Sequence, residues 1–97
     1  MSDVEDDYVI IESPLSGKLV RDGTTIDVQI YRGEDESHWV LEVVDSDMTS
    51  FVWDGQFETD QAAMDELLRT ISAEGMKAFN PAQYKKLYYR DRTLFAF

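Results

Sequence analysis

The segment 24–75 constrains the fold most, because its hydrophobic pattern changes period once, from two residues to about 3.6. In its first part, residues 24–32, apolar and polar side chains alternate, as in a strand with one buried face. The residues expected on that buried face are Ile26, Val28 and Ile30. A second alternation, over residues 38–44, directs Trp39, Leu41 and Val43 towards the core. The chain therefore begins its folded part as a sheet.

The last part of the segment, Asp60–Glu74, has the period of an amphipathic helix. Its expected apolar stripe consists of Ala63, Met64, Leu67, Leu68 and Ile71. Thr59 is expected to accept a hydrogen bond from the first-turn amides, and Gly75 to end the helix. On the outer side, Asp65 and Arg69 are spaced as an i,i+4 ion pair.

Short turns join the expected strands and predict antiparallel pairing, because parallel strands need long crossovers. Asp22-Gly23 is a strong hairpin signal, since both positions tolerate positive φ. Further strands are expected over residues 8–11, 18–21 and 49–53, the last with either Phe51 and Trp53 or Val52 buried. The predicted fold class is α+β: an antiparallel meander of four to five strands with one amphipathic helix packed on one face.

A single domain is expected for 97 residues. Residues 1–7 are acidic and are expected to be disordered, residues 24–75 form the strand and helix framework, and residues 80–97 are basic and aromatic. We call residues 80–97 the C-terminal segment. Asn80-Pro81 resembles a helix N-cap with proline at the first helical position, which predicts a short C-terminal helix from Pro81 to about Tyr89.

The net charge of −11 limits the partners that this chain would attract. Residues 1–66 contain eighteen acids and three bases, and this surplus opposes direct binding to nucleic acid, where affinity comes from neutralising phosphates. A basic protein partner is favoured instead. The chain has no cysteine, no apolar run of the roughly 18 residues that span a bilayer, and an acidic N-terminus. We therefore expect a cytoplasmic protein that does not enter a membrane.

One helix can cover only one face of the sheet, and the second face is too apolar to be merely wet. We expect it to carry Tyr31, Val40, Val44 and Trp53. Three occupants are compatible with the sequence: the C-terminal segment, a second copy of the chain in a homodimer, or a partner protein. Tyr84 and Tyr88 lie with Leu87 on one helical stripe of the C-terminal segment and are candidate contact residues.

One stretch carries a catalytic pattern. Asp45-Ser46-Asp47-Met48-Thr49 follows the apolar residues 40–44 and resembles the first motif of haloacid-dehalogenase-type phosphatases. The resemblance implies a Mg²⁺-dependent phosphatase with Asp45 as nucleophile and Asp47 as acid/base. An acidic turn between two strands explains the same letters. The parallel fold that the family uses does not agree with the predicted antiparallel sheet.

The main hypothesis is therefore a small acidic, non-enzymatic protein-interaction or regulatory module, with no catalytic residue, metal or cofactor. The alternative is a nucleic-acid mimic that inhibits a DNA- or RNA-binding protein, in which Glu34, Asp35 and Glu36 imitate phosphates. A phosphatase that uses Asp45 and Asp47 is the third hypothesis. Residues 34–66 contain eleven acids and no base, which suits either an acidic contact surface or an ordinary solvated rim.

Overall fold

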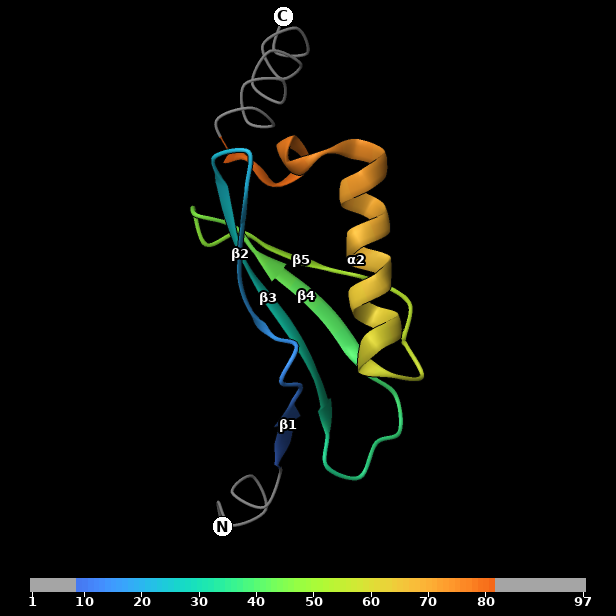
Figure 1. Ribbon diagram of the computed structural model, residues 1–97. Coiled ribbons are helices and arrows are strands. Elements are labelled where there is room, and N and C mark those ends of the chain that lie inside the picture. Colours follow the sequence, from blue (N-terminus) through green and yellow to red (C-terminus); the bar gives the residue numbers. More distant parts are fainter. Residues whose placement is uncertain (1–8, 82–97) are drawn as a thin grey trace, which may run out of the picture.

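The computed structural model of this protein describes residues 9–81, which form one antiparallel sheet with helical cover on one side (Figure 1). Its strands are β1 (Ile10–Glu12), β2 (Gly17–Arg21), β3 (Thr24–Gly33), β4 (Val40–Val44) and β5 (Ser50–Val52). They are followed by the helix α2 (Asp60–Glu74) and the 3₁₀ helix η1 (Met76–Phe79). The predicted α+β class, with five antiparallel strands, is confirmed.

Strand β3 is the centre of the sheet. It pairs along one edge with β1 and β2, and along the other with β4, which in turn pairs with β5. The strands β2 to β5 are thus the predicted meander. The strand β1 pairs with the same edge of β3 as β2, but further along β3. The β2–β3 turn has φ values of 54° at Asp22 and 75° at Gly23, as its sequence predicts.

Two serines shape the interruption between β1 and β2. The backbone amide of Ile30 donates to the hydroxyl oxygen of Ser16 at 3.0 Å, so a side chain replaces a ladder partner at this point. The backbone amide of Ser13 donates to the carbonyl of the same Ile30 at 2.8 Å. The loop therefore leaves the edge of β3 without leaving that residue's backbone unpaired.

The bounds and caps of α2 agree with the sequence prediction. The side chain of Thr59 accepts from the amide of Ala62 at 3.0 Å, and Gly75 ends the helix with a φ of 81°. The predicted apolar stripe is wrong in one position, because the buried face is Ala63, Leu67 and Ile71, whereas Leu68 is 39% exposed. Met64, another residue of the predicted stripe, is half-buried and packs against the core.

The outer side of α2 also differs from the prediction. Arg69 pairs with Glu66, one turn back at i,i+3, through two hydrogen bonds of 3.0 and 2.6 Å. Asp65 instead accepts from the side-chain amide of Gln61 at 2.9 Å. The two-pronged contact of a guanidinium with one carboxylate is stronger than a single contact, which explains the choice of Glu66.

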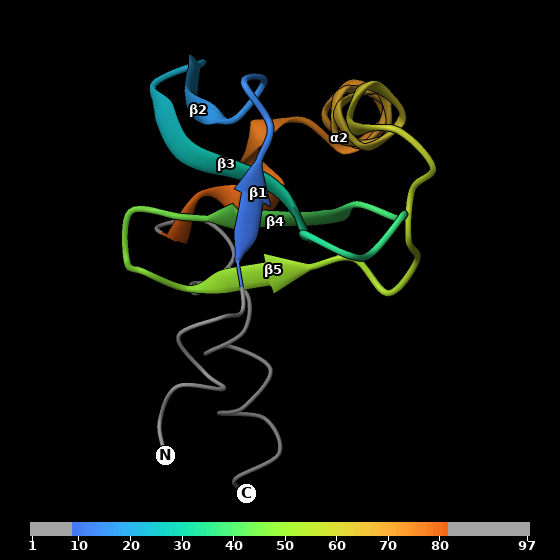
Figure 2. The same ribbon diagram turned by 90° about the horizontal axis from the view of Figure 1, so that it is seen from below.

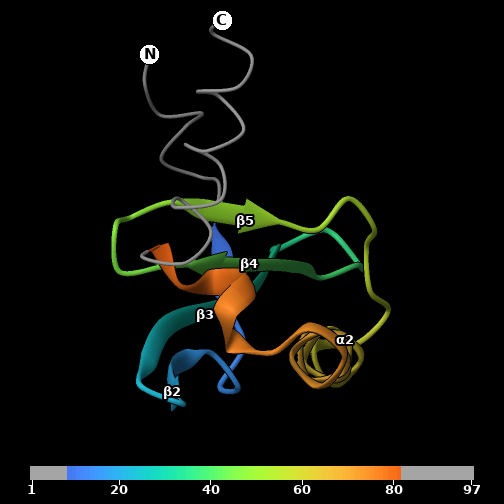
Figure 3. The ribbon, with the colours of Figure 1, turned by 90° about the horizontal axis from the view of Figure 1, so that it is seen from above.

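The core lies on a single side of the sheet. Its buried side chains come from β3, β4, α2 and η1: Ile26, Val28, Ile30, Leu41, Val43, Ala63, Leu67, Ile71, Met76 and Phe79. Trp39 packs against them from the start of β4, so the inward direction predicted for residues 39, 41 and 43 is confirmed. Views along the sheet place α2 and η1 on this side (Figures 2 and 3).

Two predicted features lie outside the described residues. They are the acidic residues 1–7 and, apart from Pro81, the predicted helix from Pro81 to Tyr89. Asn80 ends η1, with its amide donating to the carbonyl of Lys77 at 3.1 Å. Across residues 9–81, neither helix has the length and apolar character needed to cross a bilayer.

Candidate interaction surface

The face of the sheet opposite α2 is built by the residues that alternate with the core residues along each strand; we call it the open face. Register aligns its members in rows across the sheet. These residues are Ile10 and Glu12 of β1, Lys18 and Val20 of β2, Thr25, Asp27, Gln29 and Tyr31 of β3, Val40, Glu42 and Val44 of β4, and Ser50 and Val52 of β5. In residues 9–81 no helix lies on this face (Figure 3).

Apolar side chains are distributed over the open face among polar ones. Val44 lies opposite Asp27, and Val52 lies opposite Glu42. Tyr31 is directly opposite Val40, and both are half-buried by their neighbours. Val20 at one edge and Val52 at the other are 65% and 54% exposed. Val20 and Val52 are not the only apolar residues of this face. Half-buried Tyr31, Val40 and Val44 also lie on it.

A hydrogen-bonded carboxylate lies at the centre of this face. The Tyr31 hydroxyl donates to Oε1 of Glu42 at 2.9 Å, and the Ser50 hydroxyl donates to its Oε2. Three neighbouring strands are thereby joined by side chains as well as by backbone. Burial, and then the hydrogen bond and charge of Glu42, raise the pKa of Tyr31 above its ordinary value. The arrangement holds a single rotamer of Tyr31 over the sheet.

Trp53 does not belong to the open face, which corrects the sequence prediction. Register places Val52 opposite Glu42, so Phe51 and Trp53 point to the core side. There the Trp53 ring lies 6.3 Å from that of Phe79 in η1. The alternation of a strand sends neighbouring residues to opposite faces, and the sequence alone left the choice between residues 51 and 52 open.

The acidic turn between β3 and β4 has a defined shape. The Arg32 guanidinium donates to the backbone carbonyls of Gly33, Glu34 and Glu36 at 3.1, 3.2 and 2.8 Å. The same guanidinium lies 5.2 Å from the centre of the Trp39 ring. The side chains of Glu34, Asp35 and Glu36 are exposed. A cation anchored on an indole thus fixes the backbone from which three carboxylates project.

The phosphatase-like residues form the turn between β4 and β5. Asp45 is 3% exposed, and its Oδ1 accepts from the amides of Asp47 and Thr49 at 2.8 and 2.9 Å. Met48 has a φ of 67°, in the left-handed region. The buried oxygen of Asp45 therefore organises the turn backbone. Asp47 is exposed at the tip of the same turn.

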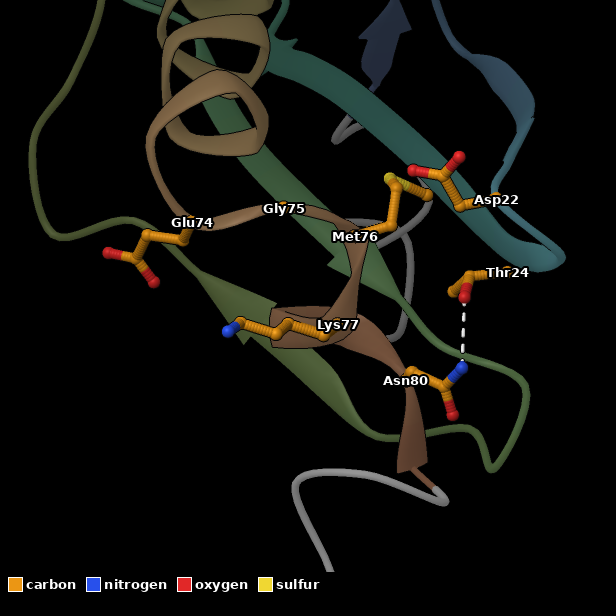
Figure 4. Close-up of a pocket in the computed structure, with 7 residues that line it drawn as sticks. All are labelled: Asp22, Thr24, Glu74, Gly75, Met76, Lys77 and Asn80. Atoms are coloured by element: carbon orange, nitrogen blue, oxygen red, sulfur yellow. Dashed lines mark hydrogen bonds between the residues drawn. The ribbon is translucent and has the colours of Figure 1, made fainter.

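Elsewhere in residues 9–81, polar and charged side chains come together in one shallow hollow without pointing at a common centre. A shallow hollow of about 400 Å³ lies between the β2–β3 turn and η1 (Figure 4). Within it Asn80 donates to the hydroxyl of Thr24 at 2.9 Å, whereas Glu74 and Lys77 point away from Asp22. Among residues 9–81 there is no group of three or more His, Asp or Glu placed to hold a metal ion.

Sequence reasoning placed Tyr31, Val40 and Val44 on one face, and the structure brings them together there. Tyr84 and Tyr88 lie outside the described residues. Val20, Glu42 and Val52 were not predicted as members of the contact surface. The sequence holds a signal for Val20, because a two-residue Asp22-Gly23 turn fixes which residues of β2 and β3 are opposite each other.

Comparisons of this chain with protein-family models, with curated proteins and with solved structures give no match.

Proposed function

We propose that this protein is a non-enzymatic protein-interaction or regulatory module whose contact surface is the open face. The observation that carries the proposal is the exposure of apolar side chains on this face, with Val20 65% and Val52 54% exposed. Water contact with these side chains is unfavourable by about 25 cal/mol for each Å² of apolar area, and a partner surface would remove that cost. Protein interfaces likewise combine apolar and polar side chains.

The chemistry of the partner follows from charge. Residues 9–81 contain fifteen acids and five bases, so a surface with an apolar centre and a basic rim would be attracted and oriented. Asp27 and Glu42 belong to the open face itself, beside the valines. The proposed partner is therefore a protein with an apolar patch flanked by lysine or arginine side chains.

The test compares two substitutions with a matched control in the full chain. Val20→Asp together with Val52→Asp places two carboxylates on the open face at exposed positions. Leu68→Asp together with Ser72→Asp adds two at exposed positions on the outer side of α2. The amount of partner protein recovered in an affinity pull-down should fall to background with the double variant and stay unchanged with the control. Equal recovery from both variants would reject the open face, and a doubled solution mass would identify the partner as a second copy.

A second function, mimicry of nucleic acid, is favoured by the acidic turn. Arg32 fixes the backbone of this turn, so the carboxylates of Glu34, Asp35 and Glu36 are presented at defined spacing. A mimic binds a nucleic-acid-binding protein in a salt-sensitive manner. Reversing these three charges would abolish such binding and leave binding through the open face unchanged. If binding persisted after this reversal and was lost with the open-face variants, the open face would be the only contact.

A further inference from the structure

A second shallow depression lies on the core side of the sheet, between β5 and η1. Its hollow has a volume of about 410 Å³. Phe51, Trp53 and Phe79 provide an aromatic floor, and Thr70 of α2 contributes to its wall. We call this surface the aromatic groove.

The floor of the aromatic groove is rigid and only partly covered. The Phe51 and Phe79 rings meet edge to face, with centroids 5.4 Å apart and an interplanar angle of 84°. Phe79 is buried, whereas Phe51 and Trp53 are half-buried. Phe51 and Trp53 keep accessible apolar ring surface, which can contact further aromatic and aliphatic side chains.

The rim of the groove is negative. Asp54 and Glu74 line it, and its lining residues include no basic side chain. An apolar floor with carboxylates at its rim fits a ligand that combines aromatic rings with cationic groups. The long stems of lysine and arginine suit such a site as well, since they cover apolar surface while their charged ends reach the rim.

The chain itself contains a ligand of this chemistry. Residues 82–97 carry four bases and one acid, together with Tyr84, Tyr88, Tyr89, Phe95 and Phe97. They begin three residues after Phe79, which forms part of the groove floor. A short covalent connection raises the local concentration of a ligand to the millimolar range, so weak contacts suffice.

We propose that residues 82–97 occupy the aromatic groove of their own chain, with Tyr84, Leu87 and Tyr88 on the aromatic floor and basic side chains facing Asp54 and Glu74. This assignment concerns other side chains than the open-face proposal. The floor residues Phe51, Trp53 and Phe79 face the core side of the sheet, and Val52 borders both surfaces. The assignment leaves the open face to the partner protein. It also explains why one end of the chain is basic while the remainder is acidic.

The test uses a spin label in the full chain. Because the chain has no cysteine, Thr93→Cys provides one attachment point without changing a charge. Amide signals of Thr70 and Glu74 in α2 should broaden more strongly than those of Gln29 and Val40, because a label on the core side of the sheet lies nearer to the helix. Dilution of the labelled chain with unlabelled, isotope-enriched chain measures broadening between molecules, which should be absent.

Charge reversal provides the matched comparison. Asp54→Lys with Glu74→Lys should remove the broadening, whereas Glu58→Lys with Asp65→Lys, two exposed acids outside the groove, should preserve it. Stronger broadening of Gln29 and Val40 than of Thr70 and Glu74, broadening between molecules, or no broadening at all would each overturn the proposal. Broadening that survives the reversal of residues 54 and 74 would also overturn it, because the basic residues would then not face that rim.

Discussion

The hydroxyl of Ser13 donates to a carboxylate oxygen of Asp60 at 2.7 Å, across 47 residues of sequence. Ser13 is 2% exposed and lies at the edge of β3, and Asp60 is the first residue of α2. The contact therefore fixes the first turn of the helix to the sheet. It helps to decide which face α2 covers and which face stays open.

Replacing Ser13 by alanine should destabilise the fold. The change removes the hydrogen bond to Asp60 and also the acceptor for the amide of Leu15, which lies 3.0 Å from the Ser13 hydroxyl oxygen. We expect a loss of about 1–2 kcal/mol in the free energy of unfolding, measured with urea. Ser72→Ala on the exposed side of α2 is the control and should change stability by less than about 0.5 kcal/mol.

Leu67 and Leu68 distinguish the two sides of α2. Leu67 is fully buried against the sheet and Leu68 is 39% exposed. Leu67→Ala should cost about 2–5 kcal/mol in unfolding free energy, since it leaves a cavity in the core. Leu68→Ala should cost less than about 1 kcal/mol. Similar losses for both variants, in the same urea titration, would contradict the observed helix orientation.

The hydrogen bond between Tyr31 and Glu42 makes a prediction about pH. The pKa of Tyr31 is raised above 10.0, first by burial and then by Glu42. The folded state therefore keeps the phenol proton at a pH where the unfolded chain loses it, and this stability is complete below pH 10.0. It decreases as the pH rises through the higher folded value.

Nuclear magnetic resonance of ¹³C-labelled tyrosine checks this directly. The Tyr31 signal, assigned from its loss in Tyr31→Phe, should titrate above pH 10.0, and Glu42→Gln should move its midpoint downwards. Stability in Tyr31→Phe should fall less steeply with pH in this alkaline range. A midpoint at the ordinary tyrosine value in the unmodified chain would show that the hydroxyl does not contact Glu42.

The interpretation of Asp45 as a turn residue predicts a difference between two substitutions. Asp45→Asn keeps an oxygen that can accept from the amides of Asp47 and Thr49, whereas Asp45→Ala leaves both without that partner. Asp45→Ala should cost about 1–3 kcal/mol in thermal or urea unfolding, and Asp45→Asn clearly less. If Asp45 were a nucleophile, the unmodified chain would hydrolyse a generic phosphoester with Mg²⁺, and Asp45→Asn would abolish that activity.

Much of this architecture could be predicted because local signals agreed with each other. The alternation in β3, the Asp22-Gly23 turn and the Thr59 cap each act within a few residues, and each is present in the structure. The exposure of Leu68 could not be predicted in the same way. It depends on where the helix axis crosses β3 and β4, which is a property of the packed layers.

The candidate surface was predictable in part for the same reason. Periodicity placed Tyr31, Val40 and Val44 on one face, but Val52 needed the register of β4 with β5. The shape of the acidic turn depends on Arg32 reaching three carbonyls, a contact that no spacing rule encodes. The aromatic groove joins β5 to η1 across more than twenty residues, so only the fold brings its floor together.

The most direct test of the proposed function adds a purified partner to the full chain. The valine and leucine methyl groups of the chain are then observed by nuclear magnetic resonance. The open-face account predicts that signals of Val20, Val40, Val44 and Val52 shift or broaden, while those of buried Val28 and Val43 change little. Leu68 on α2 should also be unaffected. Changes confined to Leu68, or binding that leaves every open-face valine unchanged, would contradict the account.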